Sequence, residues 1–240
     1  MYRLSVLLSS ILMGFITSAY ASDAIIVYSN VDTLSTGQLL SKQAVIDLAE
    51  NSEITATFAT GGIQTLKGPY QGKLTDPREG QKPDPALITE LAQFIQKVKA
   101  DRKMNVPRGR HHNDVRLWTV DVDTSRRHYC VPTSQQVMLF RPNEESKLAS
   151  SVLIKHKETG QQAQVMWPAR KETLTWPDSL PLIYGDTYTI TVKSVRGQEH
   201  FKMVVLYRLP DSLPTESHKV VWMAGRDCIP QAEMLLADLR

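Results

Sequence analysis

Short segments of β-type sequence, separated by turn residues, fill most of the chain after residue 115. The segments are rich in β-branched and aromatic residues, and pairs such as Thr159-Gly160 and Arg196-Gly197 divide them. No helical repeat lies between them, which favours antiparallel over parallel pairing. The pattern therefore predicts an antiparallel, Ig-like β-sandwich over residues 115–227. The candidate strands are 115–122, 129–131, 136–140, 151–157, 162–167, 173–176, 187–192, 201–207 and 219–223.

The first part of the chain also contains short β-type segments separated by turn residues, but fewer of them. Residues 53–58 alternate between polar and apolar side chains, and Gly61-Gly62 marks a hairpin after them. The alternation resumes over residues 63–66 and ends at Gly68-Pro69. These features predict a small β domain over residues 22–75.

Within this part, the stretch GQLLSKQAVIDLAENSEITATFATGGIQTLKGPYQGKL, residues 37–74, resembles the periplasmic FecR-like domain. The positions that carry the resemblance are Gly37, Leu39, Ile46, Leu48, Ile54, Phe58, Gly62, Leu66, Gly68 and Pro69. They cover about one sixth of the chain. The resemblance implies a non-catalytic β module of envelope sensing or scaffolding proteins. Anti-sigma signalling by FecR-like proteins uses a cytoplasmic segment and a membrane span, and we do not expect that mechanism here.

Two stretches have the period of an amphipathic helix. Residues 76–85 are rich in proline and charge and predict a linker, which we place over residues 76–114. Within it, apolar residues at spacings of three and four predict a helix over 85–103, which should pack on a β unit or, alternatively, dock a partner. A short helix is expected over residues 228–240, beginning near Pro230.

The N-terminus has the pattern of a secretory signal peptide. Arg3 precedes an apolar run from Leu4 to Ile16, and Ala19-Tyr20-Ala21 fits a cleavage site. We expect residues 1–21 to be removed and the mature chain to reach the periplasm without a transmembrane segment. An uncleaved anchor is the alternative.

Two cysteines, Cys130 and Cys228, are present. In an oxidising compartment an even number favours a disulfide. The bond would close a loop on the order of 100 residues, stabilise the fold by about 4–5 kcal/mol and pin the C-terminal helix to the sandwich. Two free buried thiols are the alternative, and the wide spacing does not fit a C-x-x-C redox or zinc motif.

The sequence gives little indication of catalysis, and we expect no catalytic residue, no bound metal and no cofactor. It lacks a nucleophile elbow, and its six histidines lack the i, i+4 spacing of a helical zinc site. His111-His112 with Asp114 is the densest group of metal-type ligands, with a solvated loop as the alternative. Asp121 and Asp123 would share one face of a strand and could line a cleft, although an exposed strand face explains them better.

Two basic loops flank the predicted strand 115–122 and supply the candidate binding residues. These are Arg108, Arg110, His111, His112, Arg126 and Arg127. Guanidinium groups in a shared pocket could recognise an anionic surface polymer or an acidic loop of an envelope protein. Alternatively, the charges only keep two exposed loops soluble. The net charge of +3 and the lack of interleaved aromatic residues argue against nucleic acid as a partner.

Three functional hypotheses follow. The first is a non-enzymatic periplasmic module that mediates protein or surface-polymer interactions as a scaffold or sensor accessory. The second is an envelope hydrolase acting on glycans or peptides, which would need Asp121, Asp123 or the His111-His112 pair to meet groups distant in sequence. The third is a chaperone-like partner that donates or accepts a β-strand at a sheet edge.

Overall fold

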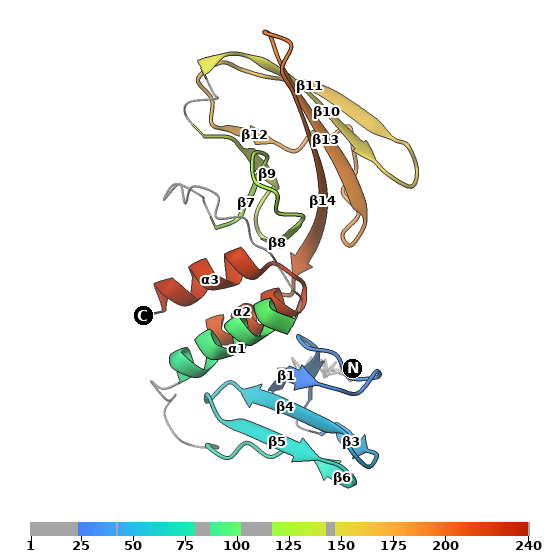
Figure 1. Cartoon of the computed structure of the whole chain (residues 1–240), viewed down its shortest axis with the longest axis vertical. Coiled ribbons are helices and arrows are strands. Elements are labelled where there is room, and N and C mark those ends of the chain that lie inside the picture. Colours follow the sequence, from blue (N-terminus) through green and yellow to red (C-terminus); the bar gives the residue numbers. More distant parts are fainter. Residues whose placement is uncertain (1–23, 42, 80–86, 102–116, 143–146, 240) are drawn as a thin grey trace, which may run out of the picture.

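The computed structural model describes residues 24–41, 43–79, 87–101, 117–142 and 147–239. Figure 1 shows three parts along the long axis: an N-terminal β unit, a central layer of helices, and a second β unit at the opposite end. The chain is therefore mainly β, as the sequence predicts. The predicted signal peptide, residues 1–21, lies outside the described residues.

The N-terminal unit consists of short strands in two sheets. One sheet has the order β2-β1-β4-β5 and the other pairs β3 with β6. The strands are β1 (Ala24–Ser29), β2 (Leu39–Leu40), β3 (Val45–Leu48), β4 (Glu53–Phe58), β5 (Ile63–Lys67) and β6 (Tyr70–Lys73). The alternation predicted for residues 53–58 is present in β4, where Ile54, Ala56 and Phe58 are buried. The resemblance of this unit to the FecR-like domain stays a prediction.

The second β unit is a sandwich of two sheets. One has the order β11-β10-β13-β14-β8 and the other the order β12-β9-β7. Its strands are β7 (Thr119–Asp121), β8 (His128–Pro132), β9 (Met138–Phe140), β10 (Ser150–His156), β11 (Gln162–Trp167), β12 (Thr173–Thr175), β13 (Thr187–Ser194) and β14 (Glu199–Leu209). Side chains of both sheets meet in one core around the buried residues Tyr129, Trp167 and Tyr188.

Two pairings in this sandwich are parallel, so the prediction of a wholly antiparallel sandwich is wrong in part. β8 runs parallel to β14, and β7 runs parallel to β9. The chain leaves β7, forms β8 in the facing sheet and returns to β9, so β7 and β9 point the same way after two reversals. Turn signals show where the chain reverses, but they do not show which sheet each strand joins.

Residues 219–223, which were predicted to form a strand, lie in a helix. Helix α2 (Glu216–Gly225) begins after Thr215, whose side chain accepts a hydrogen bond from the backbone N–H of His218. The residues from Val220 to Ala224 are all buried. A short apolar run has no period by which a buried helix can be told from a buried strand. The prediction was therefore wrong because burial on all sides removed the helical signal.

The other two helices confirm the sequence predictions within the described residues. They are α1 (Leu87–Asp101) and α3 (Ile229–Asp238). Contrary to expectation, α1 packs mainly on α2 and α3, although Lys97 Nζ lies 4.3 Å from the centre of the Tyr28 ring of β1.

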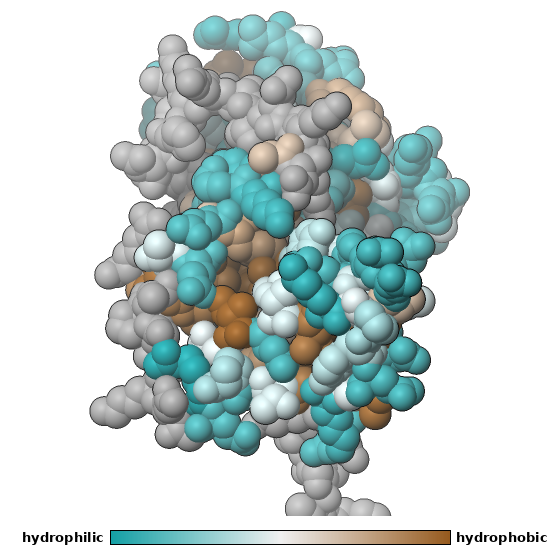
Figure 2. All heavy atoms as spheres, turned by 60° about the horizontal axis from the view of Figure 1, so that its bottom comes forward, coloured by the Kyte–Doolittle hydropathy of each residue, from teal (hydrophilic) through white to brown (hydrophobic). Residues whose placement is uncertain are grey.

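One apolar cluster contains residues of all three helices and of both β units. It includes Leu91 of α1, Met223 of α2 and Leu235 of α3, together with Ile25 of β1 and Cys130 of β8. Figure 2 shows hydrophobic residues gathered near the middle of a largely hydrophilic face. The helical layer therefore supplies the core that joins the two β units.

The helical layer is fixed to the sandwich at β8 by a covalent bond and by a buried amide. Cys130 and Cys228 form the predicted disulfide, with their Cα atoms 5.9 Å apart. Beside it, Gln231 Oε1 accepts a hydrogen bond from the Cys130 N–H at 2.8 Å. Gln231 Nε2 donates to Cys130 O at 2.8 Å and to Leu117 O at 2.6 Å. The side chain thus pairs with β8 as a neighbouring strand would.

The N-terminal unit meets α2 through glycine. A Cβ on Gly225 would lie 2.5 Å from Thr36 O and 3.0 Å from Gly37 Cα. Gly37 itself has φ +82°, the left-handed region that favours glycine. The backbones of α2 and of the loop before β2 therefore touch without side chains between them.

Replacing Gln231 should be costly. We expect Gln231→Leu to lower the free energy of unfolding by about 3 kcal/mol, because the buried N–H and C=O of Cys130 lose their partner. Urea unfolding of both proteins measures the difference. Gln93→Leu, at an exposed position of α1, is the control and should change stability by less than about 0.5 kcal/mol. Equal losses in the two variants would contradict this role.

His218 of α2 is fully buried and makes the fold sensitive to acid. Its Nδ1 lies 2.8 Å from Thr215 Oγ1, and its Nε2 has no hydrogen-bond partner among the described residues. Burial lowers the pKa of His218 from 6.5 to about 4. Between these pH values the unfolded chain binds a proton that the folded chain does not, so stability falls as the pH decreases from 6.5 to 4.

We expect this proton to account for about 2–3 kcal/mol of stability lost between pH 7 and pH 4.5. In His218→Asn, which keeps a polar group beside Thr215 but does not titrate, the loss over this interval should be smaller by that amount. Urea unfolding at the two pH values gives the comparison, with the exposed His200→Asn as control. An unchanged pH dependence in His218→Asn would show that another group is responsible.

Candidate functional site

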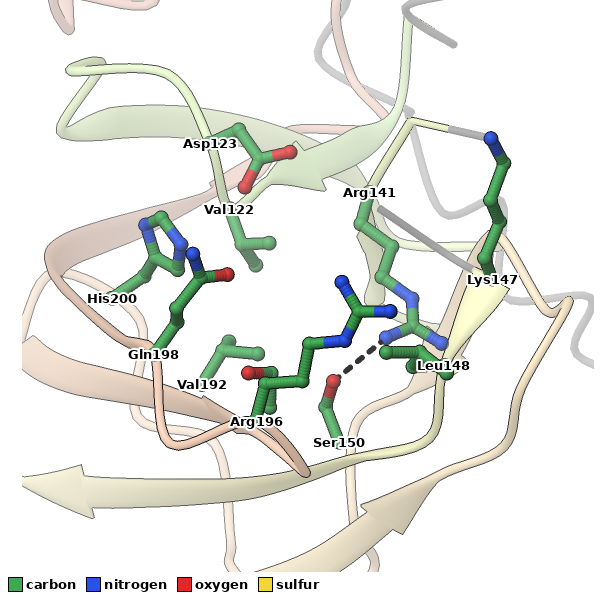
Figure 3. A pocket seen from close by; sticks show the side chains of 11 residues that line it. Val122, Asp123, Arg141, Lys147, Leu148, Ser150, Val192, Arg196, Gln198 and His200 are labelled. Atoms are coloured by element: carbon green, nitrogen blue, oxygen red, sulfur yellow. Dashed lines mark hydrogen bonds between the residues drawn. The ribbon is translucent and has the colours of Figure 1, made fainter. Parts of the chain in front are cut away.

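A polar cavity of about 290 Å³ lies at one end of the sandwich, between its two sheets. Figure 3 shows its walls. One wall comes from the β13–β14 hairpin and includes Val192, Arg196 and His200, and the other includes Asp123 and Arg141. The site is therefore built from segments that are far apart in the sequence.

Arg141, directly after β9, forms the fixed part of this cavity. Only 2% of the residue is exposed. Its guanidinium donates to Ser150 Oγ at 3.0 Å, to Pro168 O at 2.7 Å and to Lys171 O at 3.2 Å. It also lies 4.6 Å from the centre of the Trp167 ring. Neutral oxygen atoms and an aromatic face thus hold the guanidinium in one orientation.

Exposed basic groups complete the cavity. Arg196 lies in the β13–β14 turn, which the positive φ of Gly197 closes, and Figure 3 shows its guanidinium pointing toward that of Arg141. Lys147 and His200 also line the cavity and are exposed. Of the described lining residues, Asp123 is the one that carries an acidic group. Among the described lining residues, basic side chains therefore outnumber acidic ones.

A buried lysine fixes the segment that carries Asp123. Lys202 of β14 points into the sandwich, where its Nζ donates to Asp121 O at 2.5 Å and to Thr124 O at 2.6 Å. It also donates to the hydroxyl of Tyr129 at 2.9 Å. Asp121 Oδ1 accepts a hydrogen bond from the Asp123 N–H at 2.9 Å. These bonds define the path of residues 121–124 over the end of the sheet.

The same burial shifts the ionisation of this group. Burial lowers the pKa of Lys202 to about 8, while the nearby Asp121 carboxylate opposes the shift. Burial also raises the pKa of Tyr129. The phenol therefore stays protonated at neutral pH and acts as a hydrogen-bonding group.

The structure brings together few of the residues that the sequence singled out. Arg108, Arg110, His111 and His112 lie outside the described residues, so the proposed pocket shared by residues 105–114 and 124–128 is not visible. Arg126 is half-buried and Arg127 is exposed, but neither lines the cavity.

The expectation that Asp121 and Asp123 share a strand face is wrong. β7 ends at Asp121, which is buried, and Asp123 lies in the bend that follows. The alternation of side chains across a strand does not continue through a bend.

The sequence did not identify Arg141, Lys147, Arg196 and His200 as site residues. Arg196 stands in a predicted turn and Arg141 directly follows the predicted strand 136–140, and basic residues at such positions are usually solvated. Only their positions relative to the strands could have indicated a site. Arg141 follows β9, and Arg196 lies between β13 and β14, and these strand ends meet on the same side of the sandwich.

A second cavity of about 290 Å³ has a different character. It lies beside residues 135–137 and 175–184 and includes Trp176, Leu180 and Tyr184. Among its described lining residues, only Asp178 carries a charge at neutral pH. The first cavity is the stronger candidate because it concentrates charge.

Comparisons with protein-family models, with curated proteins and with solved structures found no match. In the described part of the chain, no group of three or more His, Cys, Asp or Glu side chains is placed to hold a metal ion. Within the same ranges, none of the helices has the length and apolar character needed to cross a bilayer. The assignment of a function therefore depends on the geometry of the cavity.

The role given to Lys202 predicts a loss of stability when its ammonium group is removed. Lys202→Met should lower the free energy of unfolding by about 1–3 kcal/mol, because the buried oxygen atoms of Asp121, Thr124 and Tyr129 lose a shared donor. Lys193→Met, on the exposed face of the same hairpin, should have little effect. Urea unfolding at pH 7 tests the pair, and similar stabilities of the two variants would contradict the role.

Proposed function

We propose that this protein is an envelope binding module that holds an anionic ligand, a surface polymer or an acidic segment of another protein, in the cavity between the sheets. The observation that carries the proposal is the approach of Arg196 to the buried Arg141, with Lys147 and His200 in the same cavity. Basic groups that line one cavity create a local positive potential, which attracts an anion.

The exposed guanidinium of Arg196 favours phosphate or carboxylate as the bound group. A guanidinium presents parallel N–H donors that match the oxygen atoms of these anions. Because Arg141 is already immobilised by its bonds to Ser150, Pro168 and Lys171, little side-chain entropy is lost there on binding. Arg196 is exposed and supplies an adjustable second contact.

The size of the cavity suits one charged group of a larger ligand. A volume of about 290 Å³ is at the lower end of the range for small-molecule sites, about 300–1,000 Å³. A chain-like anion that places one residue in the cavity and continues across the surface would fit this volume. This reasoning favours a polymer or a peptide segment over a free metabolite.

Export to the periplasm is part of the proposal. The signal-peptide pattern of residues 1–21 supports it, and the Cys130–Cys228 disulfide is compatible with an oxidising compartment. The resemblance of residues 37–74 to FecR-like domains points to the same setting. In this view the sandwich binds the ligand, the N-terminal unit and the helical layer support the sandwich, and the whole module acts as a scaffold or sensor accessory.

Isothermal titration calorimetry with polyphosphate, polygalacturonate and the neutral polymer dextran tests the proposal. We expect saturable binding of at least one anionic polymer, which weakens as salt is added, and none of dextran. Arg196→Ala should weaken binding by about tenfold, which corresponds to the loss of one charge-assisted contact. Arg208→Ala, on the distal half of β14, is the matched control.

Three outcomes would count against this function. The first is the absence of saturable binding for every anion. The second is an equal loss in Arg196→Ala and Arg208→Ala, which would show that only the net charge matters. The third is a loss in Arg127→Ala with none in Arg196→Ala, which would move the site to the loop at residues 124–128.

A further inference from the structure

Among the described strands, none pairs with the first half of β14 on one of its two sides. β14 has 11 residues and pairs with β13 from Glu199 to Val205. On its other side, β8 pairs only from Val205 to Leu209. The segment from Glu199 to Val204 is therefore a sheet edge, although it continues in line with the strand that β8 covers.

The backbone groups of this edge can be assigned from the hydrogen bonds around it. In an antiparallel pair, hydrogen-bonded and non-hydrogen-bonded residues alternate. Ser194 N donates to Gln198 O at the turn, and Val205 N donates to Arg127 O on the opposite side. The N–H and C=O groups of Glu199, Phe201 and Met203 therefore point away from β13.

These outward groups have no partner among the described hydrogen bonds. No backbone or side-chain bond joins the main chain of Phe201 or Met203 to any described segment on that side. Their side chains are also exposed, Phe201 by 66% and Met203 by 40%. An unpaired ladder and a row of exposed apolar side chains thus occur on the same short stretch.

We propose that the edge from Glu199 to Val204 accepts an extended segment of a partner protein as an additional β-strand. The segment would pair its backbone with Phe201 and Met203 and would place alternate apolar side chains beside theirs. The short strand β8 already uses the same edge in this way from Val205 onward. This inference does not depend on the anion-binding cavity.

Lys202 does not block this pairing. Natural proteins often protect a sheet edge with an inward-pointing charge. Here the Lys202 ammonium is held by Asp121 O, Thr124 O and the Tyr129 hydroxyl inside the sandwich. The charge is therefore satisfied within the chain and does not meet a strand added beside β14.

Two other possibilities fit the structure less well. β11 also has no neighbour on its outer edge among the strands that the structure describes, but its exposed row includes the polar residues Gln162 and Gln164. A second copy of the chain, paired antiparallel about Phe201, would set its exposed Met203 opposite the charged Glu199. A partner strand with apolar residues at alternate positions would instead place apolar side chains beside Phe201 and Met203.

A displayed library of ten-residue peptides, with Val, Ile, Thr or Phe at every second position, tests the proposal on the full chain. We expect selected peptides to bind and to slow hydrogen exchange at the amides of Phe201 and Met203.

Met203→Pro removes an outward N–H that β13 does not use, and should weaken peptide binding by about tenfold or more. Gln164→Pro, at the corresponding outward position of β11, is the matched control. Arg196→Ala should bind peptide normally, which separates this site from the cavity.

A selected peptide methylated on its alternate backbone nitrogens provides a test that leaves the protein unchanged. We expect this peptide to lose affinity by about tenfold or more, even if Met203→Pro does not fold. The proposal would be overturned if no peptide were enriched, if the methylated peptide bound equally well, or if exchange slowed at β11 instead. Dimerisation of the chain through Phe201 would also overturn it.

Discussion

The joint between strand β8 and helix α3 holds the molecule together. β8 has β14 on one side, and on the other side the amide of Gln231 bonds to both the N–H and the C=O of Cys130. The disulfide to Cys228 lies at the same residue. A ten-residue helix has little stability alone, so α3 depends on the sheet, and the edge of the sheet is completed by α3.

The features that could be predicted from the sequence are those with a local cause. Alternation identified β4, helical spacing identified α1, and compartment and cysteine number identified the disulfide. Contacts set by the tertiary structure could not be predicted in this way. The apolar residues of α2 are buried on all sides and lack a period, and the parallel course of β7 and β9 depends on the crossing of β8 to the other sheet.

The candidate site likewise depends on tertiary contacts that no local sequence pattern predicts. Arg141 and Arg196 are 55 positions apart in the sequence, and neither stands in a motif. Their meeting follows from the pairing of β10 with β13, which brings Ser150 opposite Ser194. The register between distant strands such as β10 and β13 is set by the packing of the whole core, so no local sequence pattern predicts it. The β13–β14 hairpin then contributes to both proposed surfaces, with Arg196 in its turn and Phe201 on its open edge.

The glycine contact between the N-terminal unit and α2 has a mechanical consequence. At this contact, Thr36 O and the Gly225 backbone lie against each other with no side chain between them. This backbone contact cannot adapt by changing rotamers, unlike the apolar side chains that pack between the N-terminal unit and the helices. A small displacement of the loop before β2 would therefore press directly on the backbone of α2 at Gly225.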